Sequence, residues 1–197
     1  MTVSTDTKSP SATVLARLNR DHQHLACVLQ VFEHQYRALE TDDGPDYDLL
    51  REILEYVRSF PDAIHHPTED VLFNYLMQNA SLSDGEQAAI ADNREQHAQL
   101  TEATKTLLLM IDHVFNNGIV DGAALKLMMS RYLSEQIRHM EFESMYLFPL
   151  AETRLTERDW RAIEDQIAEA DDPMFDAYEK QFESLRGYIE TEFKPAA

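Results

Sequence analysis

The chain has 197 residues, of which 44% are apolar and 27% are charged, a mixture typical of one globular domain of ordinary size. Its net charge of -19 would repel phosphate backbones and anionic membranes, which excludes nucleic acid and membranes as expected partners. The single cysteine, Cys27, excludes a fold held by internal disulfides. The first dozen residues lack an apolar core and do not resemble a signal peptide, so we expect a cytoplasmic protein.

Apolar residues recur at steps of three and four along most of the chain, which predicts an all-α protein. Short polar loops between the helices favour an up-down-up-down four-helix bundle with a C-terminal helical extension. The four helices are expected over residues 12–40, 46–78, 84–116 and 121–151. By domain, we expect a disordered N-terminal arm over residues 1–11, the bundle over 12–155 and the extension over 156–197.

Two prolines interrupt the second predicted helix. Pro61 and Pro67 each lack a backbone N–H and clash with the preceding turn, so a break or kink is expected near both. In the extension, residues 171–173 predict another break, and residues 174–193 form a last amphipathic segment. This segment could dock on the bundle, or it could pair two copies of the chain as a homodimer.

The most informative motif is His-x-x-x-Glu, which occurs twice, as His65 to Glu69 and as His139 to Glu143. A lone histidine precedes each copy: His22 lies 43 residues before His65, and His97 lies 42 residues before His139. Residues four apart share one face of a helix, and apolar neighbours place that face in the core.

Buried carboxylates without partners are costly, and bound cations would remove that cost. The repeated spacing therefore predicts a two-metal site in which each glutamate bridges both ions and open coordination positions remain. Mixed nitrogen and oxygen ligands suit iron, and manganese or zinc would also fit. The predicted ligands are His22, His65, Glu69, His97, His139 and Glu143.

Some neighbouring residues are alternatives to this set. His66 could pair with Asp70 by the same spacing of four, but His66 aligns with Met140 in the second copy, whereas His65 aligns with His139. We therefore favour His65 and Glu69. Tyr132 and Tyr146 lie seven residues on either side of His139; core packing is the simpler interpretation of both, although either could line the open side of the metals.

The two histidine motifs, with Asp21-His22, Glu95-Gln96-His97 and the segment Leu147 to Glu152, resemble the bacterial hemerythrin-like (HHE cation-binding) proteins. The resemblance implies a non-haem di-iron centre with an oxo or hydroxo group between the irons. Oxygen-carrying members have a second histidine one turn from the histidine of the third helix. Here Asn93 and Thr101 occupy those positions, so the chain is similar to the four-histidine, two-glutamate type.

Two functions follow from this resemblance. The first is a di-iron protein that binds or reacts with oxygen, peroxide or nitric oxide in oxidative or nitrosative stress or in iron handling. If it is an enzyme, its activity would be redox turnover of peroxide or nitric oxide. The second is a sensor of iron, oxygen or nitric oxide, or an iron store, without turnover.

Overall fold

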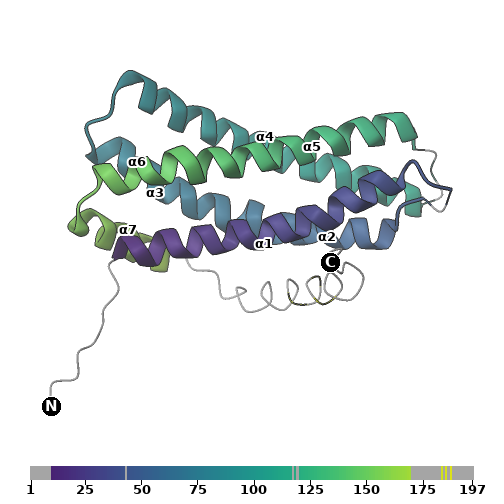
Figure 1. Ribbon diagram of the computed structural model, residues 1–197, viewed down its shortest axis with the longest axis horizontal. Helices are drawn as coiled ribbons and strands as arrows, with labels where there is room; N and C mark the ends of the chain where they lie inside the picture. The colour runs from purple at the N-terminus through teal and green to yellow at the C-terminus, as the bar shows by residue number, and fades with distance from the viewer. Residues whose placement is uncertain are drawn as a thin grey trace, which may run out of the picture.

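The computed structural model describes residues 10–42, 44–116, 118, 120–169, 183, 185 and 187, with side chains from residue 13 onward. Within these ranges the chain forms helices and turns and no strand, which confirms the all-α prediction. The long helices lie lengthwise beside one another as four rods (Figure 1). No helix in the described ranges has the length and apolar character needed to cross a membrane.

The four rods correspond to the four predicted helices. They are, in order, α1 (Pro10–Ala38); α2 (Tyr47–Ser59), η1 (Pro61–His65) and α3 (His66–Asn79); α4 (Asp84–Phe115); and α5 (Gly122–Phe142), η2 (Glu143–Leu147) and α6 (Phe148–Arg154). Short connections reverse the chain between consecutive rods, which gives the predicted up-down-up-down bundle. Helix α1 begins at Pro10, two residues earlier than expected.

Side-chain caps fix where three of these rods begin. Asp46 accepts a hydrogen bond from the backbone N–H of Leu49, and Asp121 accepts from the backbone at the start of α5. Ser83 and Glu86 form a reciprocal capping box before α4, so Ser83 is the N-cap of that helix. Each cap satisfies backbone donors that the first turn leaves free, and it therefore sets the phase of the helix that carries the site residues.

Two π-helical turns interrupt the second and fourth rods beside the two His-x-x-x-Glu motifs. Turn η1 ends at His65 and turn η2 begins at Glu143. In each case a proline, Pro67 or Pro149, lies at the second position of the helix that follows. Proline offers no N–H to the carbonyl four residues earlier, which favours a wider turn at these points. The break predicted near Pro61 and Pro67 is therefore confirmed, and it is a π-turn within a continuous rod.

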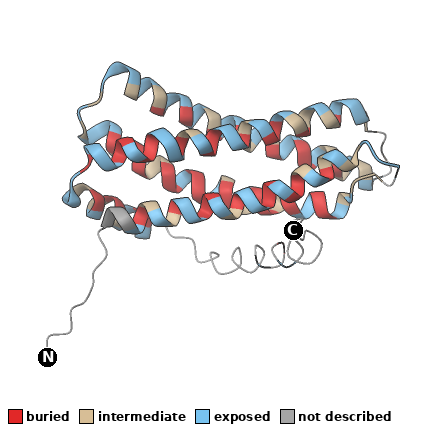
Figure 2. Cartoon of the chain, viewed as in Figure 1, coloured by how far each residue is buried: buried red, intermediate tan, exposed pale blue. Residues whose placement is uncertain are grey.

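The core divides into two apolar clusters with polar residues between them. Along α1, Leu18 belongs to one cluster, Leu25 belongs to the other, and the buried His22 lies between them. Figure 2 shows the buried residues on the facing sides of the rods. Apolar packing on both sides thus holds a polar layer at mid-length of the bundle.

Helix α7 (Glu157–Glu169) packs across one end of the bundle against α1 and α3 (Figure 1). Trp160 and Ile163 are buried in the cluster at that end, and the Tyr75 hydroxyl donates to Asp159 over 3.1 Å. The break predicted at 171–173 lies outside the described residues, as do most of 174–193 and the arm before residue 10. Leu185, from that last segment, is buried in the other core cluster.

Candidate metal centre

Seven polar side chains from all four rods are buried in the layer between the two apolar clusters. They are His22, His65, His66, Glu69, His97, His139 and Glu143. The two carboxylates have no exposed surface. All six predicted ligands belong to this group, and His66 is present in addition.

Glu69 lies among imidazoles from three rods. Its Oε1 is 3.3 Å from Nε2 of His22 and 3.2 Å from Nε2 of His65, and its Oε2 is 3.5 Å from Nε2 of His97. The carboxylate therefore has two ring nitrogens beside one oxygen and a third beside the other.

Glu143 has the corresponding position on the fourth rod. Its Oε2 is 3.2 Å from Nε2 of His22, while its Oε1 is 3.2 Å from Nε2 of His97 and 3.4 Å from Nε2 of His139. The amide of Asn93 donates to the same Oε1 over 2.9 Å. Glu69 and Glu143 thus share two neighbours, because each lies close to Nε2 of His22 and to Nε2 of His97.

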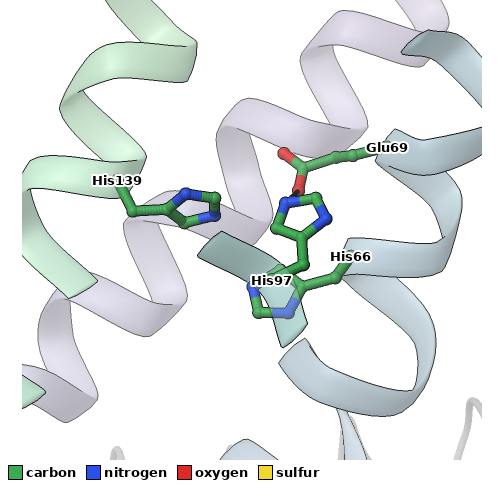
Figure 3. Close-up of side chains that lie close together, drawn as sticks. All are labelled: His66, Glu69, His97 and His139. Carbon is green, nitrogen blue, oxygen red and sulfur yellow. Dashed lines mark ion pairs between the residues drawn. The ribbon is translucent and has the colours of Figure 1, made fainter. Parts of the chain in front are cut away.

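His66 also points into this layer, next to His65, which the alignment of the two motifs favoured. Figure 3 shows His66 beneath His97, with Glu69 and His139 on the other sides. The rings of His66 and His97 are stacked, with centroids 4.4 Å apart and an interplanar angle of 10°. One potential ligand atom from each of these four residues lies within 4.8 Å of the others, and His22, His65 and Glu69 form a second such group.

Turn η1 offers a physical reason why adjacent histidines both face the interior. A π-turn closes its hydrogen bond over five residues rather than four, as in the bond from the N–H of His66 to the carbonyl of Pro61. The wider turn shifts the phase at the point where α3 begins. The alignment of the two motifs ranked His66 below His65 because the second copy has Met140 at the matching position, and the π-turn of that copy begins only at Glu143.

The Nδ1 atom of each histidine lies against a polar partner on the outer side of the ring. The pairs are His22 with Ser144 at 3.0 Å, His65 with Asp21 at 3.3 Å, His66 with Asp62 at 3.5 Å, His97 with Asp70 at 3.3 Å, and His139 with Gln96 at 3.3 Å. A partner on Nδ1 orients the ring and leaves Nε2 free for a metal. Asp70, considered in the sequence as a partner for His66, instead contacts His97.

The close contacts shift the pKa values of the histidines and carboxylates in the site. Burial disfavours the imidazolium of His65, but Glu69 and Asp21 outweigh it and raise its pKa to about 10. For His97, Asp70 and Glu143 likewise outweigh burial and raise its pKa to about 9. Burial would raise the pKa of Glu69, yet His65 and His22 hold it well below its usual value.

The pKa of His66 shifts in the opposite direction to the pKa values of His65 and His97. Burial, followed by the positive charges of His97 and His65, lowers its pKa well below the usual value. In the absence of metal, these pKa shifts favour the protonated form of His65 and His97 and the neutral form of His66.

The inner atoms of the layer lack conventional partners, which tests whether these residues fit a metal. Both oxygens of Glu69, Oε2 of Glu143 and Nε2 of His22, His65 and His139 are buried and make no hydrogen bond within the described part of the chain. Such groups are costly to bury unless something else binds them. Cations at the centre would take up these lone pairs, so the residues present fit a two-metal site.

The two tyrosines considered as ligands lie elsewhere. Tyr132 is fully buried, but its hydroxyl bonds with Thr104 at 3.0 Å and accepts from Gln136 at 3.1 Å. Tyr146 is 40% exposed and packs against Phe142. Tyr146 lies within turn η2, and this turn places Leu147 in the core in place of the tyrosine.

Two openings reach the layer from different sides. A groove of about 450 Å³ between α1 and α5 has Leu133, Ile137 and Met140 among its lining residues and reaches His22. A pocket of about 500 Å³ between α3 and α4 is more polar and is lined by His66 and His97, together with Asp62 and Asp70. The layer is thus buried but can be approached from solvent.

The helical bundle and its central group of imidazoles and carboxylates define a metal-binding module. The family model described as Hemerythrin HHE cation binding domain matches residues 13–151. The chain therefore belongs to the hemerythrin HHE family, as its motifs indicated. No curated protein and no solved structure matches this chain.

Proposed function

We propose that this protein is a non-haem di-iron protein that binds or reacts with oxygen, peroxide or nitric oxide. The single observation that carries the proposal is the pair of buried carboxylates, Glu69 and Glu143, each with two oxygens near imidazoles of different rods. Two carboxylates and four or more imidazoles match the preference of iron for mixed nitrogen and oxygen ligands. Two iron ions held there would supply binding and one-electron chemistry for a small ligand.

Different residues of the chain would hold the two sides of this centre. His22 and His65 approach Oε1 of Glu69 from one side. His97 and His139 approach Oε1 of Glu143 from the other. The outer Nδ1 partners keep the rings in place, and the apolar clusters on both sides limit the access of water to the layer. The groove between α1 and α5, with its many apolar side chains, favours uncharged small molecules as ligands.

A second candidate function is a sensor or iron store without turnover. The observation that favours it is Leu185, which is buried in the core although it belongs to the C-terminal segment beyond α7. A segment that packs on the bundle could report changes at the centre to a partner. This function predicts ligand-dependent hydrogen exchange in that segment and no sustained consumption of peroxide or nitric oxide.

Metal content and optical spectra test the proposed centre. Wild-type protein expressed in iron-rich medium is expected to hold about two irons per chain and to show near-ultraviolet charge-transfer absorption. Glu143→Ala should lose most of the metal. Glu141→Ala is the matched control, because Glu141 lies two residues away in the same motif and is exposed. Equal metal content in the two variants, or a wild type without iron, would contradict the proposal.

Reactivity then separates the two functions. The reduced, iron-loaded protein is exposed in turn to oxygen, peroxide and nitric oxide, and the spectrum and the amount of ligand consumed are followed. Repeated consumption of many equivalents supports turnover, whereas one equivalent per centre supports a sensor or store.

A further inference from the structure

We propose that divalent cations reach the buried centre through the pocket between α3 and α4, with Asp62 as the buried carboxylate that binds them on the way in. This inference rests on the proposed two-metal function and adds the path by which the centre is loaded. It concerns residues outside the predicted ligand set.

Asp62 is an unusual residue in this pocket. Its side chain is only 3% exposed, although the residue as a whole is partly buried. By strict geometry neither carboxylate oxygen accepts a hydrogen bond within the described ranges, although Thr101 and Thr104 lie near enough to stabilise the carboxylate, and Nδ1 of His66, at 3.5 Å, also lacks one. A buried carboxylate with free lone pairs is costly to maintain, and it offers a ready ligand to a cation that is losing its water shell.

The charges around the pocket favour cations. Asp62, Asp70 and Glu95 line it, and they outnumber the two positive lining groups, Arg94 and the protonated His97. Arg94 lies 3.8 Å from Asp70, so its charge is directed at that carboxylate and not at Asp62. A pocket lined by excess negative charge concentrates cations and speeds their arrival.

The pocket is also continuous with the centre. His66 and His97 line the pocket, and the same two residues belong to the group that could hold a metal with Glu69 and His139. A cation bound by Asp62 and His66 would therefore have ligands of the centre as its next neighbours. By contrast, the groove between α1 and α5 reaches the layer at His22 among largely apolar side chains, which suits a neutral ligand better than a hydrated ion.

The rate of iron uptake by metal-free protein tests this route. Ferrous iron is added without oxygen to wild type and to Asp62→Asn, which keeps the size of the side chain and removes its charge. We expect Asp62→Asn to take up iron at least about fivefold more slowly than wild type, while a chelator removes bound iron from it no faster than from wild type. Glu33→Gln is the control, because Glu33 lines the other opening. That variant should load at the wild-type rate.

Three results would overturn the proposal. The first is an unchanged uptake rate in Asp62→Asn. The second is an equal slowing in Glu33→Gln, which would indicate a general effect of the protein's negative charge. The third is faster release of bound iron from Asp62→Asn, which would show that Asp62 only positions His66. Failure of the wild type to bind iron at all would instead contradict the proposed function itself.

Discussion

Oδ2 of Asp21 lies 3.3 Å from Nδ1 of His65, so the neighbour of one candidate ligand holds the ring of another on the next rod. The same relation continues around the bundle. Asp70, which follows Glu69, contacts His97, and Gln96, which precedes His97, contacts His139.

Ser144 completes the series. It follows Glu143 on the fourth rod and contacts His22 on the first. Each rod therefore supplies candidate ligands and also the polar side chain that orients the histidine of the following rod. The packing of the four rods against one another therefore also sets the orientation of the imidazoles.

Removal of one of these outer contacts should weaken metal binding without emptying the centre. Asp21→Asn keeps the shape of the side chain but removes the charge beside His65. We expect a loss of about 10- to 100-fold in metal affinity, the usual effect of such outer partners. Competition with a chelator of known affinity measures it. Asp92→Asn, an exposed position on α4, is the control, and equal affinity in both variants would contradict the prediction.

His66 is expected to contribute to metal binding although it is outside the predicted ligand set. Its potential ligand atom lies within 4.8 Å of those of Glu69, His97 and His139. His66→Ala should therefore reduce affinity by at least about tenfold, in the same direction as His65→Ala. Metal titrations of both variants decide this. If only His65→Ala loses affinity, His66 acts as a packed core histidine.

Metal binding should release protons, and affinity should rise with pH. In metal-free protein, pKa values of about 10 for His65 and about 9 for His97 keep both imidazoles protonated at pH 7. A metal binds only neutral imidazole, so about two protons should leave per centre at pH 7. Calorimetric titration in buffers of different ionisation enthalpy counts them. A binding enthalpy independent of the buffer would contradict the prediction.

The same shifts give metal-free protein a pH-dependent stability. Both pKa values are raised above the ordinary histidine value of about 6.5. The stabilisation is therefore fully present below about pH 6.5 and is lost as the pH rises through about 9 to 10. Urea unfolding of the metal-free protein at pH 6.5 and at pH 10 should show the loss. The metal-loaded protein serves as the control, because its imidazoles hold no such protons.

Tyr132 is expected to matter for stability and not for the metal. Tyr132→Phe would leave the amide of Gln136 without the acceptor that it now reaches at 3.1 Å, at a buried position. An unsatisfied buried donor costs about 1 to 3 kcal/mol, so the free energy of unfolding should fall by that amount. Iron content should stay at the wild-type level. A loss of iron in this variant would indicate that Tyr132 takes part in metal binding.

Much of the molecule could be predicted from the sequence because helical periodicity is a local property. Steps of three and four predicted the rods, prolines predicted the break in the second rod, and the repeated motif brought Glu69 and Glu143 to one layer. The family followed from the same motifs. Spacing along one helix determines which face a residue occupies, and that face determines its burial.

Only the tertiary structure decided the features that depend on the π-turns and on contacts between rods. The turn at η1 brings His66 inward beside His65, and the turn at η2 moves Tyr146 outward. A π-turn changes the phase of everything that follows it, which a fixed helical period cannot show. The partners of the histidines lie on other rods, so spacing could not assign them, although a polar residue beside each motif was a visible signal. The sequence alone thus determined the four rods and the layer at which the six predicted ligands meet, whereas packing determined how each ring is held and which opening reaches it.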